Sequence, residues 1–182
     1  MIGRVLVAGL LLVLGTLVAI GSRLFSASFA SEGRSSPGPA LDPSALFEPA
    51  RECPHDTFAG RAAARAELQG ILFAERYPYD PRDGIRAVHR FLEAQSCYEA
   101  SGVHEGARRT GRLAARLAAR IEVDYVSSRL ALESAMAAEK WSVAHGELLK
   151  LLRLTEHRRG HPFVEHLIRV AGKVAIRASS VR

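Results

Sequence analysis

This 182-residue chain has few cysteines and lacks the familiar motifs of catalysis. Two cysteines are too few for a disulfide-dense scaffold, an all-cysteine zinc site or a ferredoxin-type iron–sulfur cluster. No nucleophile elbow, phosphate-binding loop or paired-histidine zinc motif occurs. His157, His161 and His166 are close in sequence, but a Gly-His-Pro break keeps them from sharing one helix face. We therefore predict a protein that is not an enzyme and that binds no metal or cofactor.

A long apolar run stands near the N-terminus. Residues 5–22 carry no charge and are flanked by Arg4 and Arg23. This run is close to the roughly 20 residues that a helix needs to span a bilayer core, and longer than the roughly 7–15 of a typical signal peptide. Ser28 and Ala30 would permit cleavage before Ser31. We expect an uncleaved single span, with a cleaved signal sequence as the alternative.

The composition divides the chain into three parts. Residues 1–25 are the expected transmembrane anchor or signal sequence, and residues 26–44 form a linker rich in serine, proline and glycine. Residues 45–182 are long enough for one folded domain. A short basic tail before the apolar run favours a cytoplasmic N-terminus. We therefore expect the domain on the side of the membrane away from the cytoplasm.

The expected domain is all-α. Alanine, leucine, arginine and glutamate are abundant, and the alternation of β-branched residues that marks strands is absent. Apolar residues recur at helical spacing, as in Phe163, Leu167 and Val174, or in Trp141, Leu148 and Leu151, so we expect these side chains in the core. The spacing predicts helices near 44–51, 57–75, 82–100, 104–121, 125–138, 141–156 and 162–178. One continuous helix over 104–138 is an alternative.

Two segments, residues 96–117 and 134–154, look alike when they are aligned. Each contains a helix end, a turn and then an alanine, Ala107 or Ala144, and Trp141 adds an aromatic residue at the second turn. This pattern resembles the tetratricopeptide repeat, a helix–turn–helix of 34 residues. Glu139 stands where that repeat usually has glycine, and Val103 stands where an aromatic residue is usual. An unrelated helical bundle is the alternative, because any antiparallel hairpin needs a small residue where its helices cross.

The resemblance implies antiparallel helical hairpins with a concave surface that binds peptides or partner proteins, and it implies no catalysis. Together with the N-terminal span, it suggests a membrane-anchored scaffold or adaptor of a bacterial cell-envelope complex. Such a protein would lie in the bacterial inner membrane with its domain in the periplasm. Two alternatives remain. The chain could be an accessory structural subunit of a membrane complex, or a cytoplasm-facing protein that binds anionic lipid or nucleic acid.

One helix carries a concentrated positive charge. The chain has a net charge of +6, and several of its arginines lie within residues 108–120, where no acidic residue occurs. At helical spacing these arginines cover an arc of roughly 120°. This arginine face could be solvated, paired with glutamates of a neighbouring helix, or bound to an acidic protein partner, anionic lipid or nucleic acid. The nucleic-acid reading lacks interleaved aromatic residues. The residues are Arg108, Arg109, Arg112, Arg116 and Arg120.

The two cysteines, Cys53 and Cys97, are a candidate disulfide. Within its expected helix, Cys97 falls on the arc opposite the apolar residues, which is unusual for a free cysteine. Cys53 lies in a turn before the first long helix, and the two could pair if that turn folds back. A disulfide would require an oxidising compartment. Two unrelated thiols are the alternative.

Overall fold

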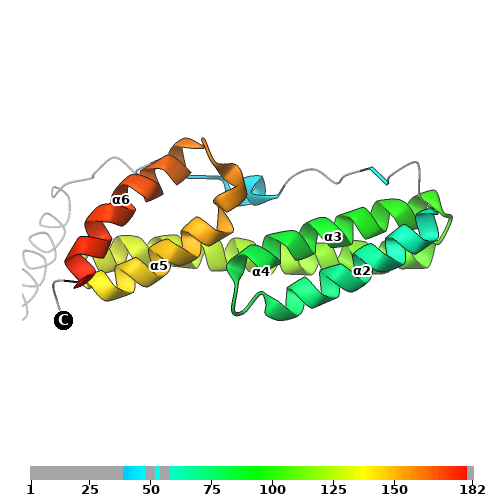
Figure 1. Ribbon diagram of the computed structural model, residues 1–182, viewed down its shortest axis with the longest axis horizontal. Coiled ribbons are helices and arrows are strands. Elements are labelled where there is room, and N and C mark those ends of the chain that lie inside the picture. The colour runs from blue at the N-terminus through cyan, green and yellow to red at the C-terminus, as the bar shows by residue number, and fades with distance from the viewer. Residues whose placement is uncertain (1–38, 48–51, 54–57, 180–182) are drawn as a thin grey trace, which may run out of the picture. The chain divides into compact units, whose positions relative to one another are not determined.

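Five α-helices and two short 3-10 helices make up the described part of the chain (Figure 1). A computed structural model gives residues 39–47, 52–53 and 58–179, and these residues contain no strand. The elements are η1 (Pro43–Leu46), α2 (Ala59–Arg76), α3 (Pro81–Ala100), α4 (His104–Ala137), α5 (Trp141–Leu154), η2 (Glu156–Arg158) and α6 (Pro162–Ser179). The bounds of α2, α3, α5 and α6 agree with the predicted ranges to within two residues. The all-α prediction is therefore confirmed for this part of the chain.

Each helix packs against the next one along the chain in antiparallel order, and α4 is shared by two groups (Figure 1). The first half of α4 packs against α3, which also packs against α2, whereas its second half packs against α5, which also packs against α6. With 34 residues, α4 is about 50 Å long. The domain is thus two helical groups joined by one helix.

Helix α4 is continuous, so the predicted division into helices over 104–121 and 125–138 is wrong. Ile121 and Tyr125 are both fully buried and lie one turn apart, so the apolar stripe runs through this region without interruption. Asp124 does not cap a new helix, because its carboxylate accepts a hydrogen bond from Tyr77 of the α2–α3 turn. The single-helix alternative is the correct one.

The turns after α3 and α4 share one backbone conformation. Gly102 and Glu139 stand at equivalent positions with positive φ angles of 74° and 55°. In each turn the next residue, Val103 or Lys140, donates its backbone N–H to the carbonyl five residues earlier at 2.9 Å. This is the Schellman helix end, which favours glycine at the left-handed position. The likeness of the two sequence segments therefore reflects two similar helix ends.

The alanines of these segments lie where the helices cross. Ala107 and Ala144 each come three residues into a helix and are 4% and 0% exposed. Trp141, expected in the core, is instead only half-buried, and the Arg177 guanidinium lies 4.6 Å from its ring centroid. The tryptophan thus lies at the end of the α5–α6 pair, and the core beneath it begins at Ala144.

The segment that precedes α2 is packed against the helices, and we call residues 39–47 the strap. Leu41 and Leu46 are 3% and 0% exposed, and the Tyr125 hydroxyl donates to the Leu41 carbonyl at 3.1 Å. His157 Nε2 lies 2.6 Å from the Leu46 carbonyl oxygen, which ties the strap to η2. The expected linker ended at residue 44, so part of it belongs to the folded unit, which begins at Pro39. Leu41 stands between Pro39 and Pro43 without a helical or strand-like repeat of apolar residues, so the sequence pattern did not predict its burial.

The candidate span at residues 5–22 and the linker up to residue 38 lie outside the described residues. Within the residues that the structure does describe, no helix combines the length and the apolar character needed to cross a membrane.

Candidate functional site

One of the five arginines of the predicted face is paired with another helix. Arg109 donates from Nε and Nη2 to the two carboxylate oxygens of Glu67 on α2, each at 2.8 Å. The Tyr98 hydroxyl donates to the same carboxylate at 2.8 Å. These hydrogen bonds, that of Arg109 above all, lower the pKa of Glu67. Arg109 therefore belongs to a structural contact between α2, α3 and α4.

Three other arginines of the face point into solvent. Arg108, Arg112 and Arg116 are exposed, and no acidic partner contacts them within the described residues. They follow one another at four-residue intervals, so they form a stripe along the first half of α4. This stripe leads towards Arg120 at the middle of the helix.

Arg120 lies beside a buried tyrosine. Its guanidinium is 5.6 Å from the ring centroid of Tyr77, whose hydroxyl donates to Asp124 at 2.5 Å. Burial, together with this hydrogen bond, raises the pKa of Tyr77 far above its ordinary value, so the phenol stays neutral. A cation over an aromatic face gains electrostatic attraction. Tyr77 therefore helps to hold Arg120 at the surface while its own ring belongs to the core.

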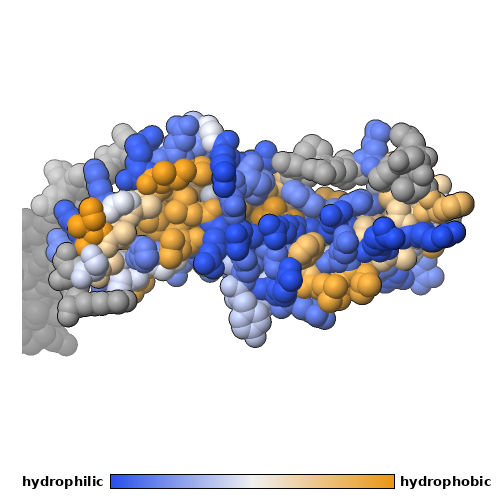
Figure 2. All heavy atoms as spheres, viewed as in Figure 1, coloured by the Kyte–Doolittle hydropathy of each residue, from blue (hydrophilic) through white to orange (hydrophobic). Residues whose placement is uncertain are grey.

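Arg120 contributes to a cleft of about 510 Å³, which we call the basic cleft. Two more cations, Lys150 and Arg153, come from α5, and Asp124 is the one acidic residue among the described residues of the lining. Figure 2 shows hydrophilic side chains gathered in the middle of this view, where the α2–α3 turn, α4 and α5 meet. The residues that line the cleft are Tyr77, Pro78, Tyr79, Pro81, Arg120, Asp124, Gly146, Leu149, Lys150 and Arg153.

The basic cleft also offers apolar surface. Tyr79 is 86% exposed at the tip of the α2–α3 turn, and Leu149 is 42% exposed on α5. An anionic group could meet the cations while an apolar side chain rests between the tyrosine and the leucine. Such a mixed lining is typical of a site that recognises a peptide segment rather than a bare inorganic ion.

The α2–α3 turn is built so that Tyr77 can form one wall of the cleft. Asp80 caps α3 by accepting from the Arg82 backbone N–H at 3.1 Å, and Pro81 occupies the first turn of the helix. The hydrogen bonds from Arg82 lower the pKa of Asp80. Gly84 lies directly under the ring of Tyr77, where a Cβ would collide with the ring carbons. The glycine therefore allows the tyrosine to approach α3 closely.

A second, smaller cleft of about 320 Å³ adjoins the first through Arg153. Most of its charges are already paired: Arg82 lies 3.7 Å from Glu156, Arg159 lies 3.4 Å from the same carboxylate, and Arg86 pairs with Asp83 at 3.2 Å. This pairing leaves less uncompensated charge for a ligand. The first cleft is therefore the stronger candidate site.

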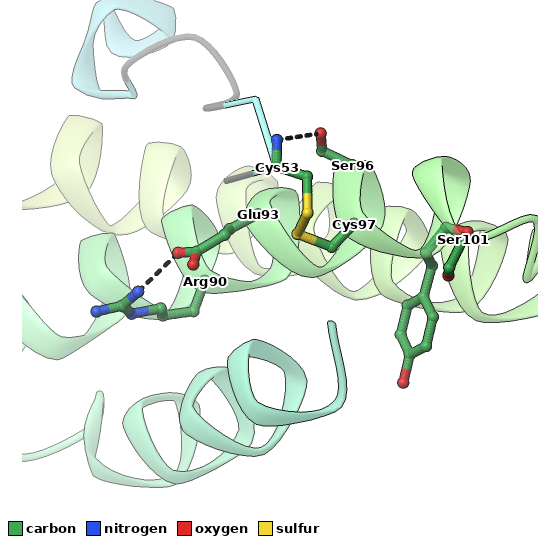
Figure 3. The surroundings of a disulfide bond; sticks show 7 residues. Cys53, Arg90, Glu93, Ser96, Cys97 and Ser101 are labelled. Atoms are coloured by element: carbon green, nitrogen blue, oxygen red, sulfur yellow. Dashed lines mark hydrogen bonds and ion pairs between the residues drawn. A yellow bond between two sulfur atoms is a disulfide. The ribbon is translucent and has the colours of Figure 1, made fainter. Parts of the chain in front are cut away.

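The two cysteines form a disulfide that ties the segment before α2 to α3 (Figure 3). Their Cα atoms are 4.8 Å apart, and the Cys53 backbone N–H donates to the Ser96 hydroxyl at 3.1 Å. Cys97 is fully buried although it lies away from the apolar arc of its helix. Its partner in the disulfide is Cys53, which lies 44 residues earlier, so residue spacing within one helix could not indicate this burial.

Residue spacing identified Arg120 but missed the rest of the basic cleft. Lys150 and Arg153 belong to α5, and Tyr79 belongs to a turn, so no single helical period connects them to Arg120. A run of two tyrosines and two prolines at residues 77–81 was the available signal of an unusual turn. Within the described ranges, no three His, Cys, Asp or Glu side chains are placed to hold a metal ion.

Comparison with known proteins identifies no relatives: no protein-family model, no curated protein and no solved structure matches the chain.

Proposed function

We propose that the protein is a membrane-anchored, non-catalytic scaffold or adaptor of a bacterial cell-envelope complex, and that it binds an acidic segment of a partner protein in the basic cleft. The observation that supports this most strongly is the set of three cations, Arg120, Lys150 and Arg153, around a lining with one acidic residue. Exposed Tyr79 and Leu149 add the apolar contacts that a peptide would use.

The proposed location outside the cytoplasm has its own support. The Cys53–Cys97 disulfide is of a kind that persists in oxidising compartments and is rare in the cytosol. Anchoring through residues 5–22 would then place the domain in the periplasm. A cytoplasm-facing binder of anionic lipid or nucleic acid, the main alternative, would have to keep this bond in a reducing environment.

We also propose that the α3–α4 and α4–α5 hairpins are two tetratricopeptide-like hairpins that share α4. Their helix ends at Gly102 and Glu139 have the same backbone hydrogen bonds, and Ala107 and Ala144 are buried at the same step into the next helix. In this arrangement the basic cleft lies against the helix that both hairpins share.

The binding proposal can be tested with the full chain in detergent and three probes: a short fluorescent glutamate-rich peptide, mixed detergent micelles containing phosphatidylglycerol, and single-stranded DNA. We expect the peptide to bind, and the double variant Arg120→Glu/Arg153→Glu to weaken that binding at least about tenfold, because both cations become repulsive. The matched control, Arg169→Glu/Lys173→Glu, makes the same charge change on exposed positions of α6. It should leave the peptide affinity within about twofold.

Equal losses in the two double variants would mean that binding depends on net charge alone and would refute the cleft. Binding to the phosphatidylglycerol micelles or to DNA without binding to the peptide would favour the alternative function. Labelling of intact cells with a membrane-impermeant maleimide, before and after reduction, tests the location separately. We expect the thiols of Cys53 and Cys97 to react in intact cells, and only after reduction.

A further inference from the structure

The outer face of α2 is apolar and has no partner within the described structure. Helix α2 packs against α3 through Ala63, Ala66 and Gly70, whereas Leu68 and Leu72 on its other side are 59% and 52% exposed. Figure 2 shows hydrophobic side chains gathered over α2 in this view. A surface helix of a globular protein normally turns such a stripe towards a core.

The exposed residues form one regular stripe, which we call the α2 stripe. Ala64, Leu68, Ile71 and Leu72 follow the three- and four-residue spacing of a helix that pairs with another helix. Ile71 is 39% exposed, so the stripe is accessible over most of its length. Contiguous apolar surface of this kind usually marks an interaction site.

The charges that flank the α2 stripe are separated along the helix. Arg61 and Arg65 lie at its N-terminal end and Glu75 lies at its C-terminal end, and all three are exposed on the same 120° arc as the leucines, at about 100° per residue. Arg65 and Glu75 are ten residues apart, about 15 Å along the axis, so they cannot pair with each other within one helix. No ion pair joins either of them to another described residue.

We infer that the α2 stripe docks against the α2 stripe of a second copy of this chain, with the two helices antiparallel. An antiparallel arrangement centred at residue 70, midway between Leu68 and Leu72, brings Glu75 of each copy opposite Arg65 of the other, twice, by two-fold symmetry. A parallel arrangement would instead place arginine against arginine and glutamate against glutamate. The stripe is therefore complementary to itself in one orientation, which selects a second copy as its occupant.

Self-docking leaves the basic cleft free, because the cleft lies on the α2–α3 turn, α4 and α5. A two-fold dimer through α2 would carry two basic clefts. A partner with two acidic segments could then bind both with a gain in avidity. The dimer itself does not depend on the proposed function, and it can be tested without a ligand.

The test is a charge-reversal cycle on the full chain, with the dimer dissociation constant measured by sedimentation equilibrium in detergent. Arg65→Glu and Glu75→Arg each make the stripe ends repel, and each should weaken the dimer about tenfold through two symmetric contacts. The double variant Arg65→Glu/Glu75→Arg restores complementary ends and should return the affinity to within about threefold of the starting protein. Leu68→Asp should abolish the dimer while leaving the helical circular dichroism unchanged.

Glu133→Arg, on an exposed part of α4, is the matched control and should leave the dimer unchanged. A monomeric full chain would overturn the inference and would mean that a different protein or a membrane surface covers the α2 stripe. A dimer that is insensitive to Leu68→Asp would overturn it as well, since another segment would then hold the copies together. Weakening by both single reversals without rescue by the double variant would refute the antiparallel orientation.

Discussion

The two helical groups that share α4 are held together in different ways. In the N-terminal group, made of α2, α3 and the first half of α4, the local buried cluster is small and consists of Ala87, Phe91 and Ala114. Ile85 and Val88 of α3 belong instead to the larger core that the C-terminal group fills. In the C-terminal group, made of the second half of α4 with α5 and α6, large side chains fill the core. They include Ile121, Tyr125, Leu132, Leu148, Leu151, Leu154 and Leu167.

This difference explains where the other stabilising contacts lie. A buried alanine removes little apolar surface from water, and burial contributes about 25 cal/mol per Å². The N-terminal group has the Cys53–Cys97 disulfide, which ties the chain before α2 to α3, and the Glu67–Arg109 ion pair, which ties α2 to α4. The C-terminal group has a continuous apolar core and the strap across it. The lesson is that two helical groups of one domain can reach stability through different interactions.

The largest expected effect is a truncation in the C-terminal core. Leu148 is fully buried, so Leu148→Ala should lower the free energy of unfolding by about 2–5 kcal/mol through lost contacts and a cavity. Leu149→Ala, one residue along the same helix and 42% exposed, should cost less than about 1 kcal/mol. Urea unfolding of the full chain in detergent, followed by circular dichroism, measures both. Equal losses for the two variants would mean that α5 does not bury the face that carries Leu148.

The next effect is loss of the disulfide in the N-terminal group. Replacing both cysteines, Cys53→Ser/Cys97→Ser, should cost about 2–4 kcal/mol because the link closes a long loop of the unfolded chain. Hydrogen exchange should quicken in α2 and α3 and change little in α5 and α6. Reduction of the unmodified chain should reproduce this pattern. A loss of protection spread evenly over all helices would contradict the division into two groups.

The smallest effect is a pH dependence that belongs to the N-terminal group. The pKa of Glu67 is lowered from 4.5 by the hydrogen bonds from Arg109, so the ionised carboxylate favours the folded state. Its contribution to stability is complete above the unfolded value and is lost as the pH falls through the lower, folded value, from about pH 5 towards pH 3. As the pH falls over this range, the free energy of unfolding should therefore decrease less for Glu67→Gln than for the unmodified chain. Urea unfolding at several pH values measures this difference.

The control for this prediction is Glu133→Gln. The Glu133 side chain is 68% exposed and its nearest pairing, with Arg129, is at 3.9 Å, so this variant should follow the unmodified chain over the same pH range. If Glu67→Gln and Glu133→Gln behaved alike, the contact between Glu67 and Arg109 would not contribute to the stability of the N-terminal group.

The helices themselves follow from local sequence. Asp80 followed by Pro81 marks the start of α3, and Gly102 and Gly160 mark helix ends, because caps and left-handed turn residues act within a few positions of themselves. The apolar spacing of Phe163 and Leu167 likewise indicates the buried face of α6. These signals depend on neighbours three or four residues away, so a single sequence contains them.

What the residues by themselves determined is an all-α domain, the bounds of α2, α3, α5 and α6, and the arginine stripe on α4. Only the tertiary structure decided that Glu67 engages Arg109 while Arg116 stays exposed, that Cys97 is covered, and that Arg120 meets Lys150 and Arg153 in one cleft. The physical reason is range: a helix forms through contacts within one or two turns, whereas ion pairs, disulfides and clefts join residues that only the packing of separate helices brings together.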